Sequence, residues 1–173
     1  MDRSMTPASA SPRREGRIFN SPLEHGLRML FILNANEGRS ADLQRLVSFD
    51  YLLVHSGDAD GPESLHPAVP FRGGELLVKR EALSMGLDRM FSRELIDKRF
   101  DHSGITYASN ALTAAFLALL ASDYARQLAI RARWTIATFG ELDDRALDDF
   151  MSERIGKWGA EFNRVGSLEK LVL

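Results

Sequence analysis

The sequence predicts a mainly α-helical fold with one small β-hairpin: a winged helix-turn-helix core followed by C-terminal helices. Apolar residues recur at helical spacing in three successive segments between residues 22 and 91. A short pattern of two strands and a tight turn follows. Three helices and then one hairpin is the order of a winged helix-turn-helix. We therefore expect a winged-helix domain over residues 17–121 with an inserted loop at 55–74, and a helical extension over 122–173 packed on it.

Capping signals mark the start of the first helix. Ser21 is a favourable N-cap, Pro22 suits the first helical position, and Glu24 completes a Ser-x-x-Glu capping box. The helix should end near Ala35. Its apolar face consists of Leu23, Leu27, Leu30 and Phe31.

A second helix is predicted after Ser40, its expected cap. Its apolar stripe consists of Leu43, Leu46, Val47, Tyr51 and Val54. A loop follows, because residues 55–70 contain three prolines and two glycines. Loops this long inside a compact domain are usually functional or disordered. The histidines and aliphatic residues of this one favour an ordered loop.

The third helix should begin at Gly73-Gly74, and Gly86 is expected to divide it into two pieces. Residues 95–100 and 105–108 then read as the strands of a hairpin, with a tight turn at 101–104. A helix from Asn110 is expected to pack through Leu112, Phe116, Leu119 and Leu120.

Two more helices are predicted in the C-terminal part. Ser122 begins one, whose exposed side should carry Arg126, Arg131 and Arg133. An acidic run opens the last helix, where acids favour the helix dipole. Its apolar face consists of Leu147, Phe150, Met151, Ile155, Trp158 and Phe162. Gly156 and Gly159 beside Trp158 suggest close approach of another surface, either this domain's core or a partner.

Composition limits the classes of function. The chain has 22 basic and 24 acidic residues, a net charge of −2. DNA-binding proteins usually carry a basic excess, so we expect weak non-specific DNA binding by the isolated protein. Residues 1–16, rich in Ser, Pro and Arg, are expected to be a disordered tail. Cysteine is absent and no stretch is long and apolar enough for a membrane span, which fits a cytoplasmic protein.

Motifs for catalysis are scarce. The sequence contains no phosphate-binding loop, nucleophile elbow or H-E-x-x-H zinc motif. Four loop residues could serve metal binding or acid–base chemistry: His55, Asp58, Asp60 and His66. Asp, Gly, Ser and Pro are also the ordinary residues of turns. We favour an ordered structural or interaction loop, and expect no catalytic residues, cofactor or metal.

Several motifs together resemble one protein family. They are Asn20-Ser21-Pro22-Leu23-Glu24, Arg45-Leu46-Val47-x-x-Asp50-Tyr51-Leu52-Leu53-Val54-His55-Ser56-Gly57-Asp58, Gly61-Pro62-x-Ser64-Leu65-His66-Pro67, Arg72-x-Gly74-Glu75-Leu76, Tyr124-Ala125 and Trp158-Gly159-Ala160-Glu161-Phe162. Over residues 20–163 the chain is similar to the middle component of ABC-three-component systems.

The resemblance implies a bacterial system directed against phage or plasmids. In such systems a small winged-helix protein accompanies an SMC/Rad50-like coiled-coil ATPase and an effector, often a nuclease. The Lamassu complexes have a comparable small subunit. The resemblance therefore implies a non-catalytic adaptor that links the ATPase to the effector and helps the assembly to sense DNA. It supplies no catalytic residues.

These inferences select two sets of candidate residues. Candidates for a partner interface are His55, Asp58, His66, Arg72, Glu75, Trp158, Glu161 and Phe162. Candidates for DNA contact are Arg89, Arg93, Lys98 and Arg99. The alternative function is a winged-helix transcriptional regulator with part of the third helix in the major groove. A hydrolase using His55, Asp58 and His66 is a third reading, and homodimerisation is left open.

Overall fold

The computed structural model describes residues 21–67, 72–101 and 104–154, apart from the side chains of 72–78 and 101. The elements are α1 (Pro22–Ala35), β1 (Ala41–Asp42), α2 (Leu43–Val54), the 3-10 helix η1 (Ser56–Ala59), α3 (Arg72–Phe91), β2 (Ile96–Asp101), β3 (Gly104–Ser109), α4 (Ala111–Leu117) and α5 (Asp123–Phe139). Residues 144–154 form a further helix. The mainly helical fold with a small sheet is confirmed. The predicted tail at 1–16 lies outside the described residues.

The sheet has three antiparallel strands in the order β1-β3-β2. The predicted hairpin is confirmed, with Phe100 opposite Ile105. Strand β1 was not predicted, because two residues are too few to show an alternating pattern. The predicted cap at Ser40 is wrong. Pairing keeps residues 41–42 extended, and the Asp42 carboxylate caps α2 by accepting a 2.8 Å hydrogen bond from the Arg45 amide.

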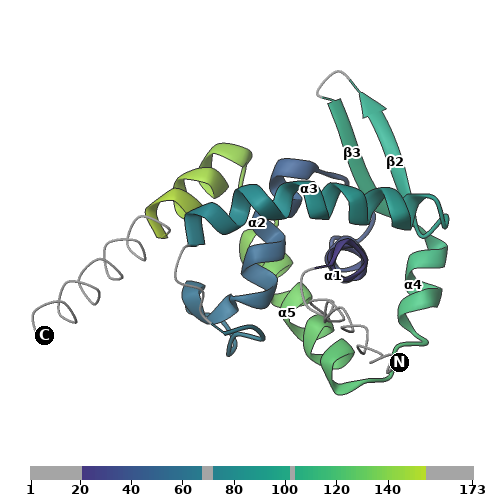
Figure 1. Ribbon diagram of the computed structural model, residues 1–173, viewed down its shortest axis with the longest axis horizontal. Helices are drawn as coiled ribbons and strands as arrows, with labels where there is room; N and C mark the ends of the chain where they lie inside the picture. The colour runs from purple at the N-terminus through teal and green to yellow at the C-terminus, as the bar shows by residue number, and fades with distance from the viewer. Residues whose placement is uncertain (1–20, 68–71, 102–103, 155–173) are drawn as a thin grey trace, which may run out of the picture.

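Helix α1 is the centre of the molecule, with α3 on one side, α5 below it and α4 beside it (Figure 1). Ser21 caps α1 as predicted by accepting a 3.2 Å hydrogen bond from the Glu24 amide. Met29, Leu30, Ile32 and Leu33 are fully buried, so this part of α1 is apolar on all sides. That is the pattern of a helix enclosed by others.

Helix α3 runs unbroken through Gly86, so the predicted division there is wrong. Gly86 instead crosses α1 at Gly26. A Cβ at Gly86 would lie 2.6 Å from the Gly26 nitrogen and would overlap the carbonyl oxygen of Pro22. The glycine therefore permits backbone contact between α1 and α3 rather than a bend.

The predicted helix starts at Asn110 and Ser122 are confirmed, and each residue caps its helix. Two packing predictions for the α4 segment are wrong, since Leu112 and Leu119 are 50% and 78% exposed. Helix α4 has only seven residues and lies at the periphery, where few side chains can reach the core.

The helices after residue 122 share one hydrophobic core with α1 and α2. The buried members include Leu128, Ile136, Phe139, Leu147 and Met151. The division into a winged-helix domain and a helical extension stays a prediction. None of the described helices is long and apolar enough to cross a membrane.

Candidate functional site

A buried ion pair joins α1 to α2. The guanidinium of Arg28 donates to Asp50 through Nε, 2.8 Å from Oδ1, and through Nη2, 3.0 Å from Oδ2. Both residues are fully buried. Burial opposes ionisation of Asp50, but Arg28, His25 and Lys79 together outweigh it and hold the pKa of Asp50 well below its usual range. The pKa of Arg28 is raised, because the carboxylates of Asp50 and Glu24 outweigh its own burial.

His25 completes the pair from the first turns of α1. Its Nδ1 lies 2.6 Å from Arg28 Nη2 and 3.2 Å from Asp50 Oδ2. A guanidinium can only donate, so at the shorter contact Nδ1 is the acceptor. Arg28 also donates through Nη1 to Glu24 Oε1 at 3.3 Å. Glu24 thus connects the buried pair to the protein's outer layer.

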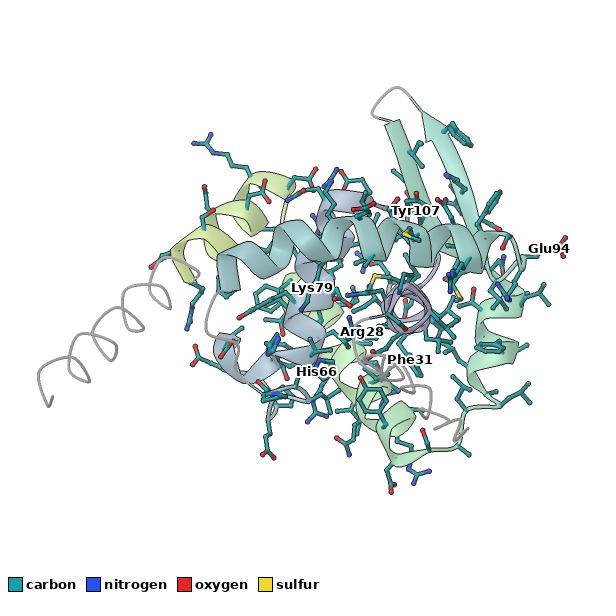
Figure 2. The ribbon with its side chains drawn as sticks, viewed as in Figure 1. Arg28, Phe31, His66, Lys79, Glu94 and Tyr107 are labelled. Atoms are coloured by element: carbon teal, nitrogen blue, oxygen red, sulfur yellow. The ribbon has the colours of Figure 1, made fainter. Side chains whose placement is uncertain are left out.

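His66 attaches the far end of the inserted loop to this group. Its Nε2 lies 3.1 Å from the Tyr124 hydroxyl, which in turn donates to Glu24 Oε1 at 3.3 Å. The two rings are nearly parallel, with centroids 6.4 Å apart. Burial, and then the positive charge of Arg28, lower the pKa of His66, although Glu24 opposes the shift. In Figure 2, Arg28, His66 and Lys79 lie close to one another between the helices.

The near end of the loop is attached to α2. The Tyr51 hydroxyl donates to Asp58 Oδ2 at 2.7 Å. His55 is only 2% exposed, with its ring centroid 4.8 Å from Tyr51 and 6.2 Å from His66. The buried Lys79 ammonium lies 5.9 Å from the Tyr51 ring. The structure therefore brings the predicted His55, Asp58 and His66 together, but around Tyr51 and Tyr124.

The middle of the loop is held by the C-terminal helices. Arg131 donates through Nε and Nη2 to the Glu63 carbonyl, at 2.8 and 2.6 Å. Its predicted exposure is wrong: Arg131 is 7% exposed, because it turns toward the loop. Gly61 lies directly against the Trp134 ring. Arg154 forms a 2.7 Å ion pair with Asp60. The described part of the loop is thus ordered and connects helices through these contacts.

We call the polar group His25, Glu24, Arg28, Asp50, His66 and Tyr124 the core network. The sequence did not indicate that Glu24, His25, Arg28, Asp50 and Tyr124 are partners in such a network. A signal existed for Arg28, which follows Leu27 and directly precedes the apolar run from Met29 to Leu33. Its partner could not be identified, because Asp50 lies 22 residues away.

One cavity of about 290 Å³ borders the core network, between α1 and the start of α5. Its walls are mainly apolar and include Leu27, Phe31, Leu120 and Leu128, with Glu24, Arg28 and Tyr124 at one side. Among the described residues, no group of three His, Cys, Asp or Glu side chains could hold a metal ion.

For the other predicted interface residues, the structure describes either the backbone alone or nothing. The side chains of Arg72 and Glu75 are not described, although both residues belong to the first turns of α3. Trp158, Glu161 and Phe162 lie outside the described residues, as do Ile155, Gly156 and Gly159.

The predicted DNA contacts lie at the end of α3 and on the hairpin. Arg89, Arg93 and Arg99 are exposed. Lys98 is different, because its ammonium forms a 3.2 Å ion pair with Asp88 and lies 5.8 Å from the Phe91 ring and 5.7 Å from the Tyr107 ring. The same region carries acidic residues, namely Glu81, Asp88, Glu94 and Asp97.

Apolar side chains are exposed on the hairpin, which projects beyond the helices (Figure 1). Phe100 is 74% exposed and Ile105, directly opposite it, is 43% exposed. Phe91, at the end of α3, is 45% exposed. Alternation along the strands places Phe100, Ile105, Lys98 and Tyr107 on one face.

Together, the fold and the core network define a small helical protein. Its loop residues contact the core network, and its hairpin projects away from the helices. The chain matches the family model of ABC-three component (ABC-3C) system Middle Component 2 over residues 18–161. It belongs to this family and is a component of an ABC-three-component defence system. Searches among curated proteins and solved structures find no match.

Proposed function

We propose that the chain is a winged-helix adaptor without a catalytic centre of its own. In this role it links an SMC/Rad50-like coiled-coil ATPase to an effector, for which a nuclease is the expected class, and DNA is sensed through the assembly. Membership of the ABC-three-component family supports the presence of partner components. The adaptor role and the partners' identities are the proposal.

The order of elements supports a winged helix. Helix, strand, helix, helix and hairpin follow one another, and β1 pairs with the inner strand β3. A winged helix has the same order, with the short first strand completing the sheet. One departure is the connection between α2 and α3, which runs from residue 55 to 71 instead of forming a short turn.

The observation that carries the adaptor role is the direction in which the family motif faces. Asp50 and His55 are buried and contact Arg28 and Tyr51, and the half-buried Asp58 accepts a hydrogen bond from Tyr51. They therefore stiffen the domain rather than form an open reaction site. The large exposed apolar side chains of the hairpin supply outward contact surface, which often marks protein interaction sites.

Charge favours protein contact over direct DNA reading. From the start of α3 to the end of the hairpin, the described residues include seven basic residues and six acidic ones. The basic residues are Arg72, Lys79, Arg80, Arg89, Arg93, Lys98 and Arg99, and the acidic ones are Glu75, Glu81, Asp88, Glu94, Asp97 and Asp101. This balance gives almost no excess of positive charge to attract phosphates. Contact of Arg89 or Arg93 with DNA is therefore proposed only within the assembly.

Reconstitution from the purified components of the chain's own system tests the proposal. We expect ATPase and effector to co-elute only when the chain is present, and a His66→Ala assembly to keep its effector activity. Association without the chain would contradict the adaptor role. Specific duplex binding by the isolated chain, with a steep salt dependence, would favour the transcriptional regulator.

A further inference from the structure

Strand β2 forms one edge of the sheet. In the strand order β1-β3-β2 it pairs with β3 on one side, and no described strand lies on the other. Figure 1 shows the hairpin extending away from the helices, with β2 as its outer strand. An edge of this kind presents backbone donors and acceptors that another strand can use.

The register identifies which backbone groups point outward. Asp101 and Gly104 are paired with only two residues between them in the sequence, so they exchange backbone hydrogen bonds. Hydrogen-bonded and non-hydrogen-bonded pairs alternate along an antiparallel ladder. The N–H and C=O groups of Ile96, Lys98 and Phe100 therefore point away from β3, toward the open edge.

Charged side chains, lysine above all, commonly discourage edge pairing, and β2 carries Asp97, Lys98, Arg99 and Asp101. Two of these charges are engaged within the protein, since Asp97 accepts a 3.0 Å hydrogen bond from Asn110, and the Lys98 ammonium is held 3.2 Å from Asp88 and lies over the rings of Phe91 and Tyr107. Phe100 and Ile105 instead expose an apolar pair at the outer end.

We propose that β2 accepts an extended peptide segment of another component of the same system as a fourth strand. The inference rests on the proposed adaptor function and identifies the surface and the mode of contact. Backbone hydrogen bonds would come from Lys98 and Phe100, as in other cases of strand addition.

The two faces of β2 define the chemistry of the segment. On one face, Phe100 and Ile105 favour an apolar residue at every second position. On the other face, Arg99 is exposed, whereas Asp97 accepts a 3.0 Å hydrogen bond from Asn110. An acidic residue opposite Arg99 is therefore favoured. The segment should alternate apolar residues with polar residues that include an acid.

A second copy of the chain fits this edge less well. Antiparallel self-pairing centred on residue 97 or 99 places Asp97 opposite Asp97 or Arg99 opposite Arg99. Pairing centred on residue 98 places Lys98 opposite Lys98, although Asp97 then faces Arg99. Directly opposed like charges destabilise a sheet. DNA fits less well because it offers no ladder of alternating amide donors and carbonyl acceptors.

Amide hydrogen exchange in the reconstituted complex tests the proposal with the unaltered protein. We expect the Lys98 and Phe100 amides to exchange at least about tenfold more slowly in the complex than in the isolated chain. Two variants separate backbone from side chain. Phe100→Ala should weaken binding, and Phe100→Pro, which also removes an edge N–H, should abolish it. Ile130→Ala, an exposed apolar residue on α5, is the control and should bind as wild type.

The outcomes separate this inference from the proposed function. A complex that forms without slower exchange at Lys98 and Phe100, and with equal binding of Phe100→Pro, overturns strand addition and leaves the adaptor role intact. Failure of the wild-type chain to form any complex overturns the adaptor role and the inference with it. Slower exchange at these amides in the isolated chain at high concentration, with a dimer mass by light scattering, assigns the edge to a second copy. Slower exchange at these amides with duplex DNA assigns the edge to nucleic acid. Either result overturns the proposal that the edge binds a peptide.

Discussion

Arg28 and Asp50 form a bidentate ion pair inside the hydrophobic core, with Nε 2.8 Å from Oδ1 and both side chains buried. The pair joins α1 to α2, and through Glu24 and Tyr124 it reaches the loop residue His66. A motif that looks like a potential reaction site in the sequence therefore serves to hold the loop on the core.

Removal of one partner should be costly, because it leaves an uncompensated buried charge. We expect Asp50→Ala to lower the free energy of unfolding by about 3–5 kcal/mol. The matched control is Asp149→Ala, whose carboxylate lies 3.9 Å from Arg145 on the surface and should contribute less than about 1 kcal/mol. Urea denaturation measures both, and equal losses would contradict the account.

Stability should fall on mild acidification because of His66. Its folded pKa lies below the ordinary value of 6.5, so the unfolded chain binds the proton more readily. The contribution is fully present above pH 6.5 and is lost as the pH falls through the folded pKa. We expect wild type to lose more stability than His66→Gln between pH 7.5 and 5.5, in urea denaturation at each pH. An identical loss would show that His66 does not titrate as described.

Asp50 should control stability in stronger acid. Its folded pKa is depressed below the ordinary value of 3.8, so its contribution is present above that value and is lost as the pH falls below it. We expect acid unfolding of wild type to begin below about pH 4. Tyrosine and tryptophan fluorescence during an acid titration checks this, with Asp149→Ala as the control. Retention of native fluorescence at pH 2 would contradict the prediction.

At the crossing of α3 and α1, replacing Gly86 by alanine should change the stability in the direction opposite to that expected from helix propensity. Alanine is favoured over glycine within a helix by about 1 kcal/mol. Gly86→Ala should nevertheless destabilise the protein by about 1–3 kcal/mol, because the added methyl group would overlap the backbone of α1. Met85→Ala on the exposed side of α3 is the control. A Gly86→Ala variant with a raised melting temperature would refute the close crossing.

Arg131 should hold the inserted loop in place. Arg131→Ala leaves the Glu63 carbonyl without its two guanidinium donors, and should cost about 1–3 kcal/mol. Arg133→Ala, at an exposed position two residues later, should be close to neutral. Limited proteolysis within residues 56–67 should be faster in Arg131→Ala than in wild type, and unchanged in Arg133→Ala. Equal cleavage of both would show that the loop is held by other contacts.

Local signals predicted much of the fold, and long-range contacts did not show in the sequence. The cap at Ser21, the helix starts at Asn110 and Ser122 and the hairpin were all correct, because each depends on a few neighbouring residues. Arg131 was misplaced because its partner Glu63 is 68 residues away. Strand β1 depends on pairing with β3, which is distant in the chain.

The candidate site was predicted in part. His55, Asp58 and His66 do lie together, as their closeness in one loop suggested. Their inward direction could not be predicted, because it is set by Tyr51, Tyr124 and Glu24 on three different helices. Helical periodicity alone does not show which polar side chain on a helix meets a given loop residue.

Purification of the tagged wild-type chain from its native host, after nuclease treatment at moderate salt, tests the adaptor role. Mass spectrometry of the purified material then shows what the chain binds. For an adaptor, we expect recovery of a long coiled-coil ATPase in an amount comparable to the chain. Recovery of the chain alone, with specific duplex binding in a direct assay, would contradict the adaptor role and identify a DNA-binding regulator.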